Sequence, residues 1–184
     1  MSEELIDICD EKNNLLGIQK EKSVAHKEGL WHRASHIWIY NKKGEILLQL
    51  RAKNKSLFPG VWDVSVGGHI SAGEDPLTTA LREVEEEIGL VVKEEDLEFW
   101  EIRTQNLVSG DLKNNEFMYV YLVEFNGDIS GLKLQKEEVE KIAFIPVETI
   151  ERELITEPQK YLPHGQYWND ILDAVKKKLS HNNQ

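Results

Sequence analysis

Residues 68–90 read GHISAGEDPLTTALREVEEEIGL, a glycine-containing loop followed by the pattern of one short helix. Asp75 is a suitable N-cap, and Pro76 suits the first helical position, where its missing N–H costs nothing. Gly89 suits the left-handed conformation that ends many helices. Apolar residues recur between these ends at helical spacing, which predicts one buried helix face. The residues of this face are Leu77, Ala80, Leu81, Val84 and Ile88.

The same helix carries three glutamates, Glu83, Glu86 and Glu87, to one side of the apolar stripe. Residues three and four positions apart are neighbours on a helix, with Cβ atoms about 5–6 Å apart, so these carboxylates repel one another. A bound divalent cation offsets such repulsion, and oxygen ligands of this kind suit Mg²⁺ or Mn²⁺ shared with substrate phosphates. A solvated acidic helix face is the competing interpretation, because runs of glutamate usually form one.

The spacing around these glutamates is more specific than the glutamates themselves. It consists of a glycine, five residues, a glutamate, seven residues, and then Arg-Glu-apolar-x-Glu-Glu-x-Gly-apolar. This pattern resembles the signature of the Nudix hydrolases at every fixed position. Those positions are Gly68, Glu74, Arg82, Glu83, Val84, Glu86, Glu87, Gly89 and Leu90.

The resemblance implies a Nudix-type α/β/α sandwich with a mixed sheet, and an enzyme that hydrolyses a diphosphate bond. Its substrates would be nucleoside diphosphates or triphosphates, or other diphosphates linked to a group X. The three glutamates would hold Mg²⁺ or Mn²⁺ together with the backbone carbonyl of Gly67, and Arg82 would orient them. The metal would neutralise the phosphate oxygens and activate a water molecule.

A second resemblance, to the isopentenyl-diphosphate isomerases, covers roughly residues 5–146. It rests on the segments at residues 25–26, 30–34, 51–55, 58–62 and 115–116. These isomerases use a catalytic cysteine just before a Gly-His pair, where this chain has Gly67. Because a glycine moves no proton, the sequence favours hydrolase chemistry on an isomerase-like scaffold. An isopentenyl-diphosphate isomerase and a non-catalytic sensor of nucleotide diphosphates are the alternatives.

The isomerase resemblance gives candidate roles to three further residues. Glu116 matches the isomerase glutamate and is a candidate metal ligand or general base, with a surface-loop glutamate as the alternative. One of the helix glutamates could equally be the base. Arg51 and Lys55 match residues that contact the diphosphate, and both residue types bind phosphate oxygens. Solvated surface charge is the alternative for these two.

Three histidines, His26, His32 and His69, match metal-binding histidines of the isomerases. Three imidazoles would suit Zn²⁺ or Mn²⁺, which makes a second metal site one interpretation. Packing and hydrogen bonding within the fold are the other. The isomerases carry a carboxylate two positions before their later glutamate, where this chain has Asn114.

The whole composition limits the partners of this protein. The chain has 184 residues and a net charge of −11, which argues against nucleic-acid and anionic-membrane partners and requires cations for a polyphosphate substrate. The single cysteine, Cys9, allows no internal disulfide or cysteine zinc site, and we expect it to be buried. The acidic start and the absence of an apolar run of about 20 residues predict a cytoplasmic protein. A homodimer is expected by analogy alone.

The remaining patterns predict a mixture of strands and helices, and therefore an α/β fold with a mixed sheet. Strands are expected at residues 5–9, 15–19, 36–40, 45–50, 61–66, 97–104, 117–125 and 143–147. Helices are expected at residues 148–154 and near the C-terminus, with a short helix or turn at residues 20–28. We expect a single domain over residues 1–180 and a disordered tail at residues 181–184.

Overall fold

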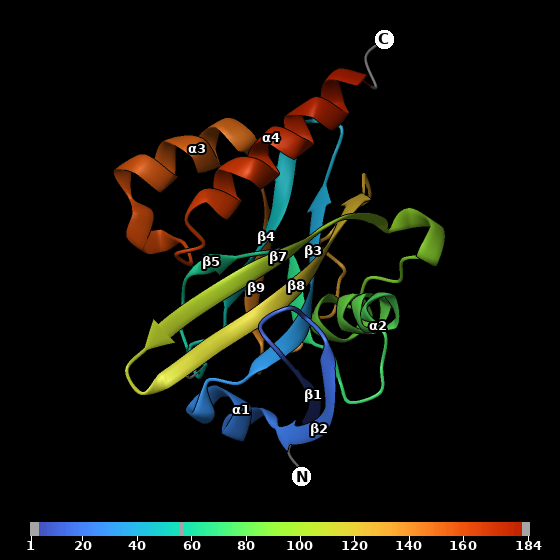
Figure 1. The fold of residues 1–184 in the computed structure, drawn as a ribbon. Helices are drawn as coiled ribbons and strands as arrows, with labels where there is room; N and C mark the ends of the chain where they lie inside the picture. Colours follow the sequence, from blue (N-terminus) through green and yellow to red (C-terminus); the bar gives the residue numbers. More distant parts are fainter. Residues whose placement is uncertain (1–3, 56, 182–184) are drawn as a thin grey trace. The chain divides into compact units, whose positions relative to one another are not determined.

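The computed structural model describes residues 4–55 and 57–181, which form the strands and helices labelled in Figure 1. Its strands are β1 (Leu5–Cys9), β2 (Leu15–Glu21), β3 (Trp31–Tyr40), β4 (Glu45–Arg51), β5 (Trp62–Asp63), β6 (Val66–His69), β7 (Glu98–Ser109), β8 (Leu112–Glu124) and β9 (Val139–Pro146). Its helices are α1 (Lys22–Glu28), α2 (Pro76–Ile88), α3 (Val147–Thr156) and α4 (Gln166–His181), with short 3₁₀ turns at Glu94–Asp96 and Pro158–Lys160.

The chain divides into two compact units. The first comprises Met1–Ile37, Gly67–Glu85 and Val91–Leu122. The second comprises Trp38–Val66, Glu86–Leu90 and Val123–Gln184. The expected single domain over residues 1–180 stays a prediction. Of the expected tail, His181 belongs to α4, and residues 182–184 lie outside the described part of the chain.

The first unit contains two antiparallel hairpins that both pair with β3. β1 and β2 form the first, and the carboxylate of Asp10 closes its turn by accepting the N–H groups of Lys12 and Asn14, each at 2.9 Å. β7 and β8 form a longer hairpin (Figure 1), and β6 also pairs with β3. α1 packs against the first hairpin, where Ala25 joins Ile6 and Ile8 in a small buried cluster.

The second unit is built around β4, which pairs antiparallel with β5, with β9 and with the end of β3. A parallel bridge joins Trp62 to Tyr161, so the pairing is mixed. α3 and α4 lie side by side in this unit (Figure 1). Trp38 is completely buried and anchors α4, because its indole N–H donates to the Tyr167 hydroxyl at 2.6 Å and its ring packs edge-on against Trp168.

The observed elements confirm the predicted α/β fold with a mixed sheet, but residues 61–66 are not one continuous strand. β5 ends at Asp63, and β6 begins at Val66 and continues through both glycines to His69. At this break, side-chain oxygens and not strand carbonyls accept the backbone N–H groups. The Asp63 carboxylate accepts the Val64 N–H at 2.7 Å, and the Ser65 hydroxyl accepts the Ile39 N–H at 2.8 Å. Gly67 and Gly68 therefore belong to a strand rather than to a loop.

The ends of α2 follow the predicted capping pattern. Asp75 Oδ1 accepts the N–H groups of Leu77 and Thr78, both at 3.0 Å, and Gly89 has a left-handed φ of 69°. A Cβ on Gly89 would lie 2.9 Å from the Lys133 backbone, so this position needs glycine for space as well as for its φ. Among the described residues, no helix is both long enough and apolar enough to cross a membrane.

Candidate functional site

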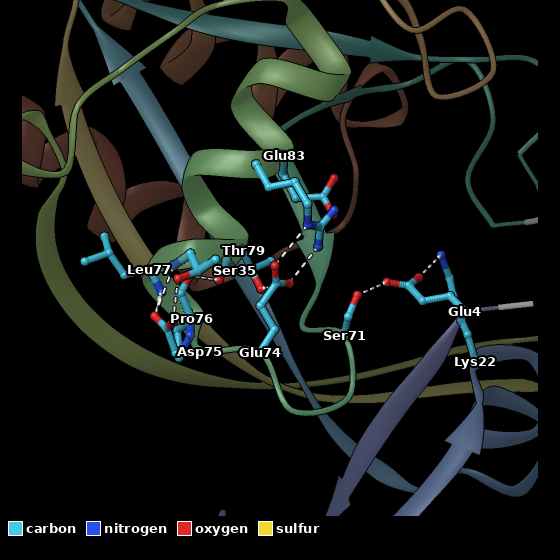
Figure 2. A network of polar contacts seen from close by, with 12 residues as sticks. Glu4, Lys22, Ser35, Ser71, Glu74, Asp75, Pro76, Leu77, Thr79 and Glu83 are labelled. Carbon is cyan, nitrogen blue, oxygen red and sulfur yellow. Dashed lines mark hydrogen bonds and ion pairs between the residues drawn. The ribbon is translucent and has the colours of Figure 1, made fainter.

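A chain of charged contacts fixes Glu83 at the middle of α2 (Figure 2). The Arg82 guanidinium donates to both carboxylate oxygens of Glu74, at 3.2 and 2.9 Å, and to Glu83 Oε1 at 2.7 Å. The Thr79 hydroxyl donates to Glu74 as well, at 2.6 Å. The hydrogen bonds from Arg82 hold the pKa of Glu74 below its usual value, so the Glu74 carboxylate is anionic at neutral pH.

The backbone of β6 runs directly against Glu83. A Cβ added to Gly68 would lie 2.2 Å from Glu83 Cδ and 2.4 Å from Glu83 Oε1, which is well inside any real contact. Glycine is therefore the one residue that lets this carboxylate lie flat on the strand. The contact explains why a glycine precedes the helix, and it places Glu83 beside the strand that carries Gly67.

The last turn of α2 carries the other two glutamates, and we call α2 with Glu83, Glu86 and Glu87 the glutamate helix. Glu86 is exposed, whereas Glu87 is only 4 % exposed and the Glu83 side chain only 12 % exposed. Two of the three carboxylates are thus largely withdrawn from water, unlike an ordinary solvated acidic face. Buried charge is costly unless it is paired or coordinates a cation. Glu85, on the same helix, is also exposed.

A second group of ligand-type side chains comes together in the first unit, from four separate elements. We call it the histidine centre, and it consists of His26 from α1, His32 from β3, His69 from β6 and Glu116 from β8. One ligand atom from each lies within 4.8 Å of the others. Glu116 Oε1 is 3.2 Å from His69 Nε2 and 3.5 Å from His32 Nε2, and the two Nε2 atoms of His26 and His69 are 3.2 Å apart.

The electrostatics of the histidine centre keep His69 and Glu116 in metal-binding form. Desolvation lowers the pKa of His69 to about 3, so this imidazole is neutral at pH 7. Burial raises the pKa of Glu116, but the His69 ring, whose Nε2 lies 3.2 Å from the carboxylate, acts in the opposite direction, and the net pKa lies well below its usual value. A neutral imidazole and an ionised carboxylate are the forms that coordinate a cation.

His32 gives the sharpest test of whether a cation fits the centre. Its ring is completely buried, and Nδ1 donates to the Leu30 carbonyl at 2.9 Å, because a carbonyl can only accept. In the neutral ring, the Nε2 lone pair then faces the carboxylate of Glu116, and this buried atom has no hydrogen-bond partner in the part of the chain that the structure describes. The lone pairs of His32 Nε2 and of the Glu116 carboxylate repel each other unless a cation lies between them. Three nitrogens and one carboxylate are ligands typical of Zn²⁺, Mn²⁺ or related divalent ions.

The two predicted phosphate-binding residues have protein partners in the second unit. The Arg51 guanidinium donates to Asp63 at 3.0 Å, and to the carbonyls of Phe58 and Leu57 at 3.0 and 2.9 Å. Lys55 forms an ion pair with Glu138. Both side chains are mostly buried, at 18 % and 22 % exposed, so neither is simple solvated surface charge. Their phosphate contacts stay predictions.

The support of the glycine loop was not visible in the sequence. The carboxylate of Asp7 on β1 accepts the Gly73 N–H at 2.7 Å, and the Ser71 hydroxyl donates to Glu4 at 3.1 Å. Glu4 in turn pairs with Lys22, 3.8 Å away (Figure 2). The first hairpin therefore holds the loop that leads into α2. No local pattern signals this contact, because its partners are more than 60 positions apart in the sequence.

The chain is similar in sequence and in fold to known proteins. The sequence profile of the NUDIX domain matches residues 30–164. Nudix hydrolase 3 of Arabidopsis thaliana is 36 % identical over the whole chain, which spans 25 % of that protein's length. An isopentenyl-diphosphate Δ-isomerase of Serratia proteamaculans is 31 % identical over 86 % of each sequence. A crystal structure from Deinococcus radiodurans has the same fold, with a TM-score of 0.67, 20 % identity, and coverage of 95 % of this chain and 98 % of that one.

Proposed function

The chain belongs to the Nudix hydrolase family, and from this premise we propose that it cleaves a diphosphate bond with the help of a divalent cation. The proposed substrates are nucleoside diphosphates and triphosphates, or other small diphosphates linked to a group X. The observation that carries the proposal is the position of Glu83, locked by Arg82 on one side and lying against Gly68 on the other. Such fixation is what an oxygen ligand for a shared metal needs.

We assign the cation to the carboxylates of Glu83, Glu86 and Glu87 and to the backbone carbonyl of Gly67. Mg²⁺ or Mn²⁺ bound there supplies charge neutralisation of the diphosphate and a water molecule of lowered pKa. Arg82 orients Glu83 through the ion pair described above and is itself held by Glu74. Because Arg82 lies between two carboxylates, it keeps Glu83 from turning away when no substrate is bound.

The proposed general base is either a helix glutamate or Glu116. The lowered pKa of Glu116 keeps it ionised at neutral pH and so able to accept a proton, but it also makes Glu116 a weaker base than an ordinary carboxylate. Arg51 and Lys55 are proposed to bind phosphate oxygens, and their fixed positions would reduce the entropy lost on binding. Gly67 supports hydrolysis over isomerisation, because the position of the isomerase cysteine carries no proton donor.

We further propose that the histidine centre holds a second divalent cation. The support comes from the unpartnered, completely buried Nε2 of His32 and from the ionised Glu116 beside it. A cytoplasmic location and a homodimer are proposed on the sequence alone.

The test is phosphate and monophosphate release by the purified protein with Mg²⁺ or Mn²⁺. The panel holds nucleoside di- and triphosphates, nucleotide sugars, dinucleoside polyphosphates and isopentenyl diphosphate.

Glu83→Gln should lower turnover by about a hundred- to thousandfold without unfolding the protein, because it removes one anionic ligand. Glu85→Gln is the matched control, since it removes the same charge from an exposed position of the same helix. A Glu83→Gln enzyme within about tenfold of wild type would contradict the assignment.

A further inference from the structure

Asp63, the last residue of β5, contacts two side chains that come from distant parts of the second unit. Its Oδ2 accepts a hydrogen bond from Arg51 Nη1 at 3.0 Å, and its Oδ1 lies 2.7 Å from His164 Nε2. An ionised carboxylate accepts hydrogen bonds and donates none, so Nε2 of His164 carries the proton of this contact. The three side chains therefore form a continuous chain from His164 through Asp63 to Arg51.

The contact between Asp63 and His164 is almost completely withdrawn from water. The two side chains are only 6 % and 2 % exposed. The imidazole also packs against two rings of α4, with its centroid 5.4 Å from that of Tyr167 and 5.7 Å from that of Trp168. Hydrogen bonds to a charged group are strong, and more so away from water, so a ring held by packing fixes the orientation of the carboxylate.

Arg51 is held on its other side by the loop between β4 and β5. Its Nε donates to the Phe58 carbonyl at 3.0 Å, and its Nη2 donates to the Leu57 carbonyl at 2.9 Å. Phe58 has a φ of 47°, which a bulky residue keeps only where its surroundings fix the backbone. Contacts to described residues thus use three of the five guanidinium N–H groups and leave one each on Nη1 and Nη2.

We propose that Asp63 and His164 are positioning residues for Arg51, and that His164, acting through Asp63, keeps the guanidinium oriented towards a phosphate of the substrate. The inference rests on the phosphate contact of Arg51 proposed above. Arginine is long and flexible, so a guanidinium that is already held loses less conformational entropy when phosphate binds. The carboxylate also offsets part of the positive charge. The contribution of Arg51 therefore depends on the direction of its two remaining N–H groups, which can bind phosphate oxygens in parallel.

The test is the dissociation constant of methylenediphosphonate, a diphosphate analogue that resists hydrolysis, measured by isothermal titration with Mg²⁺ in excess. Arg51→Gln should weaken binding by about tenfold or more, because it removes the paired N–H groups. His164→Leu should weaken binding by about three- to tenfold, because Asp63 loses the donor that fixes it. His164→Gln should restore most of this loss, since its amide nitrogen can donate to Asp63.

A matched pair of substitutions tests Asp63 itself. Asp63→Asn keeps the shape of the side chain but replaces an acceptor by a donor, so it should weaken binding of the analogue at least as much as His164→Leu does. Asp173→Asn makes the same change at an exposed position of α4 and should leave the dissociation constant unchanged. Asp63→Asn binding equal to that of Asp173→Asn would overturn the role of the carboxylate.

The double variant Arg51→Gln/His164→Leu separates positioning from general support of the fold. If His164 acts only through Arg51, the double variant should bind the analogue as weakly as Arg51→Gln alone does. A merely structural role of His164 would make the two losses multiply. Multiplied losses, or a His164→Leu affinity within about twofold of wild type, would overturn the inference.

Failure of the inference is distinguishable from failure of the proposed function. If Arg51→Gln binds the analogue as tightly as wild type, the phosphate contact of Arg51 is wrong and the inference falls with it. The hydrolase assignment is tested separately, by turnover with Glu83→Gln, and does not depend on that result. Circular dichroism of each variant verifies that lost binding is not a lost fold.

Discussion

The glutamate helix and the histidine centre are the two candidate cation sites of this protein, and the sequence encodes them in different ways. The three glutamates lie within five consecutive residues, and helical periodicity alone places them together. The histidine centre takes one residue from each of four elements, separated by as many as 90 positions from His26 to Glu116. The glutamate helix is thus a site formed by local structure, whereas the histidine centre is formed by the topology of the fold.

The two sites also differ in how their ligands are held. Glu83 is fixed by a charged partner, Arg82, and by a glycine that lets the strand approach. The histidine centre is fixed by burial and by backbone hydrogen bonding, as in the contact from His32 to the Leu30 carbonyl. The position of Glu83 therefore depends on the two residues that hold it, Arg82 and Gly68. Substitutions of these residues should lower turnover more than substitutions in the histidine centre.

The largest effect is expected from Gly68→Ala. The new methyl group would overlap Glu83, so either the carboxylate or β6 must move. A displacement of about 1 Å at a reacting centre costs about a hundredfold in turnover, and we expect a loss of at least that size. Steady-state turnover with the best substrate of the panel measures it.

Gly131→Ala is the control for Gly68→Ala. A Cβ at Gly131 would meet nothing within 4 Å, so this variant should keep wild-type activity. A fully active Gly68→Ala enzyme would mean that Glu83 need not lie against the strand. The glutamate helix would then depend less on its supports than the comparison with the histidine centre suggests.

A smaller effect is expected from Arg82→Lys. Lysine keeps the positive charge but has no planar fork, so it cannot bind both oxygens of Glu74 and also reach Glu83. We expect kcat to fall about tenfold, with KM for the substrate nearly unchanged, because the role of Arg82 is to position a ligand. The measurement is the separate determination of kcat and KM.

Arg103→Lys is the matched control for Arg82→Lys, since Arg103 pairs with Glu101 on β7 and takes no part in either site. A change in KM alone would indicate that Arg82 contacts the substrate and is not a positioning residue.

Much of the fold could be predicted from sequence because local signals were strong. Asp75 and Gly89 marked the ends of α2, and local residue patterns marked most strands. β7 extends to Ser109, beyond the predicted residues 97–104, because its outer part, which mixes polar and apolar residues, is held by pairing with β8. Cross-strand partners, and not local preference, decide such a segment.

The candidate sites were predictable to different degrees. The roles of Glu83, Glu86 and Glu87 followed from spacing, and they stay predictions until activity is measured. The sequence left open whether His26, His32 and His69 bind a metal, because a linear pattern does not give the distance between imidazoles. The structure brings them together, with Glu116 beside them.

His32→Gln tests whether the two sites are independent. It removes one imidazole, so the affinity of the histidine centre for Co²⁺ should fall by about ten- to a hundredfold, whereas Mg²⁺ binding to the glutamate helix should persist. Isothermal titration of each metal measures both. His36→Gln, on the same strand but outside the centre, is the control. Loss of both metals together would show that the two sites are coupled.

The smallest effect concerns the stability supplied by Glu74. Its pKa is lowered chiefly by the hydrogen bonds from Arg82, so the folded state favours the ionised form. The stabilisation is therefore complete above the ordinary value of 4.5 and is lost as the pH falls through the folded-state pKa. Since both side chains are partly exposed, Glu74→Gln should cost about 1–2 kcal/mol of unfolding free energy near pH 7. Urea unfolding of the metal-free proteins at neutral and acidic pH measures the difference, which should shrink towards zero in acid.

Glu95→Gln, in an exposed pair with Lys93, should change stability little at either pH. A Glu74→Gln difference that is the same at both pH values would mean that Glu74 acts through packing, and that only Glu83 holds Arg82 by charge.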